Sequence, residues 1–196
     1  MPVNYNELFE INKTIERFRN SKLQIVTKNR DEKTIKELID KGHYLFGENK
    51  VQEAQEKFKN INNPNVELHL IGPLQTNKVK LALQLFHCIQ SIDRPKLVNE
   101  ISKQQHKITT KTKEYFIQVN IGEEPQKSGI HPDDLSNLYD LCIIKNLKIS
   151  GLMCIPPADK PSKFFFNKMV LLRDKLNENL TLSMGMSNDY KIALKN

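Results

Sequence analysis

Short apolar runs alternate with longer amphipathic stretches along the whole chain, and this alternation constrains the fold more than any other feature. The runs are rich in β-branched residues, and most are bounded by Gly, Asn, Asp or Pro, as strands are. They occupy residues 22–28, 43–47, 68–72, 88–93, 115–120, 149–155 and 181–185. Helical patterns cover residues 6–20, 31–42, 48–60, 94–107, 132–145 and 163–180. Strict alternation predicts an α/β fold in which right-handed crossovers join parallel strands.

The spacing of the runs, roughly 20 to 35 residues, favours a TIM-type (βα)8 barrel over a doubly wound nucleotide-binding sheet. No GxGxxG or GxxxxGK[ST] follows any run, which also weakens the nucleotide hypothesis. A barrel of this type closes with eight strands, whereas only seven runs are visible before Asn196. We therefore expect a single domain over residues 1–196 that is short at its C-terminus, with its eighth strand missing.

Composition excludes several classes of protein. No apolar run approaches the roughly 20 residues that span a membrane, and the N-terminus does not resemble a signal peptide. The cysteines Cys88, Cys142 and Cys154 are isolated in apolar stretches, so we expect buried thiols in a reducing compartment. These features predict a cytoplasmic protein with no membrane partner and no bound metal.

The net charge of +7 raises the possibility of nucleic-acid binding. The basic residues are mostly Lys, however, and they are mixed with Glu and Asp along the chain. No dense basic block is interleaved with aromatic residues. The charge pattern therefore favours a solvated Lys-rich surface over a nucleic-acid interface.

In barrels of this kind the active face lies at the carboxyl ends of the strands, and Lys28 is the last residue of the first run. Alternation places Lys28 on the same strand face as Gln24 and Val26. If that face points into the barrel, partial desolvation would favour a neutral, nucleophilic amine suited to a Schiff base. The alternative is that Lys28 has left the strand and reaches solvent.

The segment 183–189 follows the seventh run and has the composition of a tight turn. Ser187 is a plausible helix N-cap, and Gly185 permits a close backbone approach. A turn that opens a helix can bind phosphate through backbone N–H groups. An ordinary capped helix is the simpler interpretation of the same residues.

Two further polar residues lie at the ends of runs or within them. Asn49 follows the second run, where it would cap the next helix or point its amide into the mouth of the barrel; capping is favoured. His69 lies inside the third run without a second His or Cys at metal spacing, so we expect a hydrogen-bonded barrel histidine.

Taken in order, six segments resemble the pyridoxal phosphate homeostasis proteins, the YggS/PROSC family. They are VTKNR, FGENKVQEAQEK, HLIGPLQTNKVK, IQVNIGEEPQKSGI, GLMCIPP and LSMGMSNDYKIAL. The resemblance runs from about residue 5 to the end of the chain, and the order of the motifs is more specific than any one of them.

The resemblance implies the barrel of the alanine racemase N-terminal domain, with the cofactor pyridoxal 5′-phosphate at its carboxyl face. Lys28 matches the Schiff-base lysine of the family, and Asn49 matches an asparagine that lines the pocket. Met153 matches an apolar wall position. The segment that approaches the phosphate contains Ser183, Gly185, Met186 and Ser187.

The resemblance ends before the family's eighth strand, where an Arg-x-Gly-[Ser/Thr] pattern helps to hold the ring nitrogen and the phosphate. On this basis we expect a non-catalytic, monomeric protein that buffers pyridoxal phosphate and delivers it to apo-enzymes. The alternatives are a truncated or decayed paralogue with weak binding and, less favoured, an amino-acid racemase, which needs two opposed acid–base groups.

Overall fold

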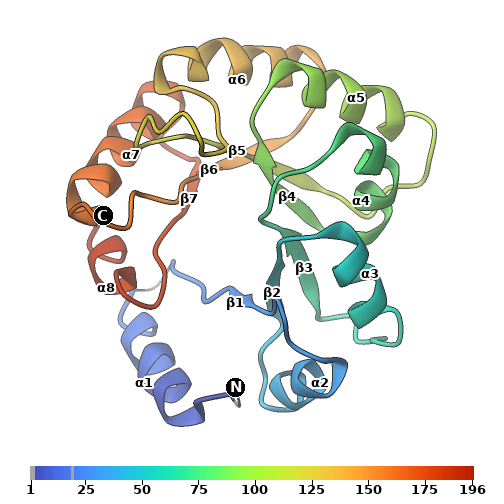
Figure 1. Ribbon diagram of the computed structural model, residues 1–196, viewed down its shortest axis with the longest axis vertical. Helices are drawn as coiled ribbons and strands as arrows, with labels where there is room; N and C mark the ends of the chain where they lie inside the picture. The colour runs from blue at the N-terminus through green and yellow to red at the C-terminus, as the bar shows by residue number, and fades with distance from the viewer. Residues whose placement is uncertain (1–2, 19) are drawn as a thin grey trace.

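The computed structural model describes residues 3–18 and 20–196. Its seven strands form one parallel sheet in the order β1-β2-β3-β4-β5-β6-β7, so each strand pairs with its neighbours in sequence. Figure 1 shows the sheet curling into an incomplete barrel with β1 and β7 as its edges. The strands are β1 (Ile25–Val26), β2 (Leu45–Glu48), β3 (Glu67–Leu70), β4 (Cys88–Ile92), β5 (Glu114–Gln118), β6 (Ile149–Met153) and β7 (Thr181–Ser183).

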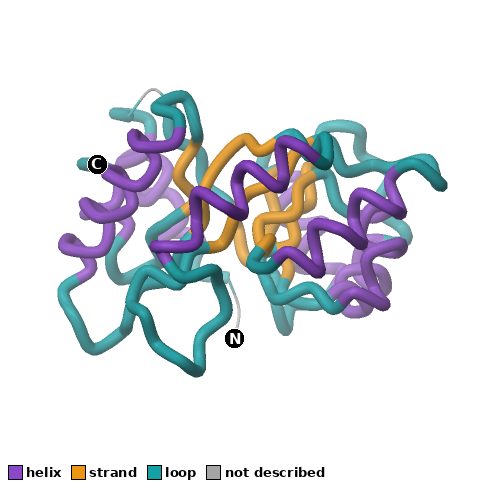
Figure 2. The backbone as a smooth tube through the Cα atoms, turned by 90° about the horizontal axis from the view of Figure 1, so that it is seen from above, coloured by secondary structure: helices purple, strands orange, loops and turns teal. Residues whose placement is uncertain are grey.

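The helices lie outside the sheet, as Figures 1 and 2 show; α2 to α7 join successive strands, α1 precedes β1 and α8 follows β7. They are α1 (Tyr5–Ile15), α2 (Glu32–Asp40), α3 (Val51–Phe58), α4 (Val79–Leu85), α5 (Pro95–Gln105), α6 (Leu135–Ile144), α7 (Ser162–Leu176) and α8 (Tyr190–Ala193). Short 3₁₀ turns, Thr76–Lys78 and Pro132–Asp134, precede α4 and α6. This is the βα alternation that the sequence predicts.

The register between strands decides which side chains face the barrel and which face the helices. Phe46 pairs with Leu68, and Gly47 pairs with His69. Phe46 packs against Phe58 of α3, so its face of the sheet is the helix side. Gly47 and His69 therefore face the barrel interior, as do residues that share their register on neighbouring strands.

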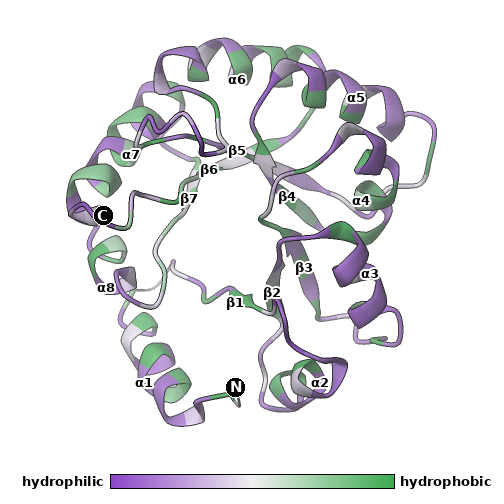
Figure 3. Ribbon diagram, viewed as in Figure 1, coloured by the Kyte–Doolittle hydropathy of each residue, from purple (hydrophilic) through white to green (hydrophobic). Residues whose placement is uncertain are grey.

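The hydrophobic core lies between the sheet and the surrounding helices. It includes fully buried side chains such as Ile35 of α2, Leu83 of α4, Ile101 of α5 and Phe166 of α7. Figure 3 shows both polar and apolar residues on the outer helices, as expected for helices with one buried face. The barrel interior also carries buried polar side chains, among them His69 and Gln90.

The seven predicted strands are confirmed, with shorter bounds than their apolar runs. The helix expected over residues 6–20 ends at Ile15, and residue 19 lies outside the described residues. All three cysteines are buried thiols, as expected. Within the described residues, no helix has the length and apolar character needed to cross a membrane.

Candidate functional site

Because all seven strands are parallel, their carboxyl ends meet at one face of the barrel. Lys28 lies there, in a turn immediately after β1. Its side chain is exposed and forms no hydrogen bond or ion pair with the described part of the chain. Of the two alternatives that the sequence left open, the structure shows the second, in which Lys28 has left the strand and its side chain reaches solvent.

The backbone around Lys28 is nevertheless sharply defined. Arg30 N donates to Thr27 O at 3.0 Å, which closes a turn over residues 27–30. Asn29 adopts a φ of 58°, in the left-handed region that Asn tolerates better than most residues. Thr27 is fully buried and faces the helices, so Lys28 projects from the opposite side of the strand end.

Sequence reasoning missed a charged cluster behind this turn. Glu48 is the last residue of β2 and is fully buried, and the side chain of Lys57 from α3 is only 10% exposed. The sequence offered one signal of this cluster, the carboxylate of Glu48 directly after an apolar run. It was missed because Glu48, Glu53 and Lys57 also fit the exposed face of a helix.

The other edge of the barrel places Ser183 and Met153 in the interior. They pair across β6 and β7, and Met153 packs with Cys88 and Phe116. Ser183 Oγ donates to Oε1 of Gln90 at 2.6 Å, although the two residues lie on β7 and β4. Ser183 thus connects opposite walls of the barrel below the mouth.

The turn after β7 differs from the prediction. Helix α8 begins at Tyr190, so Ser187 is not its N-cap, and the N-cap Asp189 makes no side-chain cap. The carboxylate of Asp189 instead accepts a hydrogen bond from Met186 N at 2.6 Å. Gly185 has a φ of 91°, and a Cβ there would lie 2.9 Å from that of Ala193. Met186 and Ser187 are exposed at the surface of this turn.

Asn49 is half-buried after β2, on the interior side with Gly47. The predicted capping role is wrong, because α3 starts at Val51 with Lys50 as its N-cap. A Cβ on Gly72 would lie 2.1 Å from the carbonyl oxygen of Asn49, so the backbones after β2 and β3 are in close contact. Only glycine fits at position 72, and this contact fixes Asn49 at the mouth.

His69 is hydrogen-bonded in the barrel, as expected. Its Nδ1 lies 2.9 Å from Nε2 of Gln90. Since the amide nitrogen donates, Nδ1 accepts and the ring proton resides on Nε2. Burial lowers the pKa of His69 to about 4, so the ring is neutral near pH 7 and the Glu67 carboxylate 3.8 Å away forms no ion pair with it.

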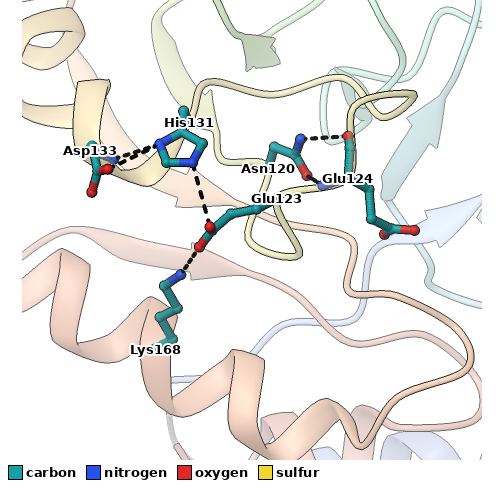
Figure 4. Close-up of polar contacts among 6 residues, drawn as sticks. All are labelled: Asn120, Glu123, Glu124, His131, Asp133 and Lys168. Atoms are coloured by element: carbon teal, nitrogen blue, oxygen red, sulfur yellow. Dashed lines mark hydrogen bonds and ion pairs between the residues drawn. The ribbon is translucent and has the colours of Figure 1, made fainter.

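The loop after β5 is organised by its own polar contacts, which Figure 4 shows. The amide of Asn120 both donates to Glu124 O at 2.8 Å and accepts from Glu124 N at 3.2 Å. Glu123 pairs with Lys168 of α7, and this ammonium lowers the pKa of the carboxyl group. His131 lies 3.5 Å from the second oxygen of Glu123. Asn120 therefore stabilises this loop rather than pointing a free amide into the mouth.

The barrel interior still has polar atoms to offer a ligand. Nε2 of Gln24 and Oε1 of Gln118 are buried without a hydrogen-bond partner in the described structure. Such atoms are costly unless they are satisfied. Together with the Lys28 amine and the glycine turn after β7, they fit a small polar aldehyde that carries an anionic group.

The alanine racemase N-terminal domain family model matches residues 10–192. A pyridoxal phosphate homeostasis protein of Aquifex aeolicus is 37% identical over 170 residues, which cover 82% of this chain and 74% of the relative. The chain belongs to the pyridoxal phosphate homeostasis protein family. The order of motifs had indicated this family.

Solved structures of this family share the fold. PipY of Synechococcus elongatus without PLP has a TM-score of 0.86 and 29% identity, covering 97% of this chain and 92% of PipY. PipY with PLP bound has a TM-score of 0.72 and 28% identity, covering 94% of this chain and 93% of PipY. The predicted barrel type is thereby confirmed.

Proposed function

We propose that this chain binds pyridoxal 5′-phosphate at the carboxyl face of the barrel, with Lys28 as the covalent attachment point, and serves cofactor homeostasis without catalysing a reaction. The observation that carries the proposal is the exposed amine of Lys28 just after β1, which forms no hydrogen bond or ion pair with residues 3–18 and 20–196. The PLP-bound structure of PipY, which has the same fold, supports it.

Lys28 would hold the cofactor through its amine, and the cofactor would supply an aldehyde that this amine can bind covalently with loss of water. Asn49 and Met153 would line the pocket beside this bond. The turn after β7 would receive the phosphate through the backbone N–H groups of Gly185 and Ser187, with the Ser183 hydroxyl below them. Met186 would lie beside the phosphate, its own N–H already donating to Asp189. This assignment places the cofactor across the opening between the two edge strands.

A holding role fits these residues better than catalysis. Racemisation needs an acid–base group on each side of the α-carbon. Besides the Lys28 amine, the proposed contacts are an amide, two thioethers, two hydroxyls and backbone groups, which do not exchange protons readily near neutral pH. The proposed site therefore offers one amine to bind an aldehyde and no opposed partner for it.

The direct test is to titrate the protein with pyridoxal phosphate, record the visible absorption band, and reduce the adduct with borohydride for peptide mass spectrometry. We expect a band from the native chain, with the adduct on Lys28, and none from Lys28→Ala. Lys33→Ala, which removes another exposed lysine, is the matched control and should behave as the native chain.

Each other outcome contradicts one part of the proposal. No band from the native chain would exclude cofactor binding, and a band only at high cofactor concentration would favour the decayed paralogue. A band that survives Lys28→Ala would move the attachment point. Exchange of the α-proton of alanine at a useful rate would favour a racemase.

A further inference from the structure

Three charged side chains form a cluster between β2 and α3, on the helix side of the sheet. Lys57 Nζ lies 2.8 Å from Oε1 of Glu48 and 2.6 Å from Oε1 of Glu53. Glu48 is fully buried, and one of its oxygens, Oε2, has no hydrogen-bond partner among the described residues. Burying charged groups costs free energy even when they are paired, so a gain in stability does not by itself explain why the cluster is there.

The cluster binds the residue before Lys28. Lys57 Nζ donates to the main-chain oxygen of Thr27 at 2.6 Å. The Thr27 hydroxyl donates to Oε1 of Glu48 at 2.6 Å. With Glu48, Glu53 and the Thr27 carbonyl as acceptors, all three N–H bonds of the Lys57 ammonium have partners. The main chain entering Lys28 is thus held through both its carbonyl and its side chain.

The cluster also binds the residue after Lys28. Asn29 N donates to Oε1 of Glu53 at 2.8 Å, while Asn29 has its left-handed φ of 58°. The carboxylate of Glu53 therefore accepts from both Lys57 and Asn29, and the ammonium lowers the pKa of this carboxyl group. Both neighbours of Lys28 are fixed by one set of ionised side chains.

Strand geometry keeps the cluster away from the Lys28 side chain itself. Thr27 faces the helices and is fully buried, whereas Lys28 is exposed and projects from the opposite side. The three charged residues can therefore fix the position of the Lys28 Cα without occupying its amine. Holding a reacting group in place before its partner arrives lowers the entropic cost of bond formation.

We propose that Glu48, Glu53 and Lys57 are positioning residues that present Lys28 at the barrel mouth by fixing the main chain on both sides of it. The inference rests on the proposed function, since it takes Lys28 as the attachment point for an aldehyde cofactor. The cluster acts through Thr27 and Asn29 and does not touch the cofactor.

The test uses Glu53→Ala, because Glu53 is 27% exposed and its loss leaves the buried Glu48–Lys57 pair intact. Glu56→Ala is the matched control, as an exposed glutamate of the same helix outside the cluster. Glu53→Gln keeps an oxygen that can accept from Asn29 N, so it should rescue part of the effect. Each variant of the 196-residue chain is mixed with pyridoxal phosphate well below its melting temperature.

Two readouts separate positioning from stability. The first is the amide hydrogen exchange of Asn29 in the ligand-free protein, which we expect to be slow in the native chain and in Glu56→Ala but fast in Glu53→Ala. The second is the rate at which borohydride-trapped adduct accumulates on Lys28. We expect that rate to fall about tenfold in Glu53→Ala, as for the loss of one charge-assisted hydrogen bond.

A purely structural role would lower the melting temperature of Glu53→Ala and leave the rate of trapping on Lys28 at the native value. An unchanged rate of trapping on Lys28, measured in a variant whose Asn29 exchange is accelerated, would overturn the positioning role. The proposal that Lys28 binds the cofactor would be unaffected. Native protection of Asn29 in Glu53→Ala would overturn it as well. If the native chain itself trapped no cofactor on Lys28, the proposed function would fail first and take the inference with it.

Discussion

The turns after β1 and β7 flank the same opening of the barrel, yet they are held in different ways. The turn over residues 27–30 is held on its helix side by charged side chains of β2 and α3, of which Glu48 is fully buried and Glu53 is 27% exposed. The turn over residues 184–189 relies on its own backbone, on Gly185 and on one contact from Asp189. The proposed covalent attachment point is therefore fixed by the core of the protein, whereas the proposed phosphate turn depends on local conformation.

Removing Lys57, the cation of α3 that holds the turn after β1, should produce the largest loss of stability. Lys57→Ala would leave the buried Glu48 carboxylate without its cation, and we expect a loss of about 3–5 kcal/mol in the free energy of unfolding at pH 7. Chemical denaturation measures this change. Lys59→Ala, which removes an exposed lysine next to the same helix, should cost less than about 0.5 kcal/mol.

The double variant Lys57→Ala, Glu48→Gln sharpens this prediction. Because the amide carries no charge, much of the lost stability should return. A double variant as unstable as Lys57→Ala would show that packing rather than charge holds the turn after β1.

Strand β7, which precedes the turn over residues 184–189, is connected to the barrel interior by hydrogen bonds from Ser183 to Gln90 and from Gln90 to His69. The stability of the protein should therefore depend on the pH at which His69 is protonated. Burial lowers the pKa of His69 from 6.5 to about 4, so between these values the unfolded chain binds a proton that the folded chain does not. Stability should therefore fall as the pH is lowered through this window, by at most about 3 kcal/mol.

Melting temperatures measured between about pH 7 and pH 4 test this assignment. His69→Gln should flatten the dependence, whereas His106→Gln, at an exposed position, should leave it unchanged. A profile as steep in His69→Gln as in the native chain would show that other groups cause the pH dependence.

The smallest loss of stability is expected from substitution of Gly185, in the turn after β7. Gly185 and Gly42 both have positive φ, at 91° and 85°, but only Gly185 has a neighbour in the way of a Cβ. Gly42→Ala should cost about 1 kcal/mol from backbone strain alone, and Gly185→Ala about 2 kcal/mol. Thermal or chemical unfolding of the two variants measures the difference.

The same two variants should also differ in their affinity for pyridoxal phosphate. Gly185→Ala should weaken binding severalfold, because Met186 and Ser187 would move with the turn, while Gly42→Ala should bind as the native chain does. Equal affinities in the two variants would argue that the turn after β7 does not hold the phosphate.

The strand order was predictable because each apolar run is bounded by turn residues and separated from the next by a helical pattern. The starts of α3 and α8 were not. Asn49 and Ser187 both have good capping chemistry, but α3 begins at Val51 with Lys50 as its N-cap, and α8 begins at Tyr190 with Asp189 as its N-cap. Capping preference alone therefore did not fix where these two helices begin.

The site was predictable in part, for a physical reason that Lys28 illustrates. Its position at a strand end follows from the sequence pattern, but its exposure depends on the open edge of the sheet. The Glu48–Lys57 pair joins residues nine positions apart on a strand and a helix, and only the tertiary packing of α3 against β2 brings them together. Sequence periodicity therefore located the amine and missed the cluster that holds its main chain.

The sequential strand order has a consequence for how this chain folds. Each strand pairs with the one that precedes or follows it, so every pairing closes only one crossover loop. Successive βα units can then assemble from the N-terminus during synthesis without waiting for a distant partner. Thr27, Glu48 and Lys57 all lie within the first three of these units, so the support for Lys28 can form while most of the barrel has yet to be translated.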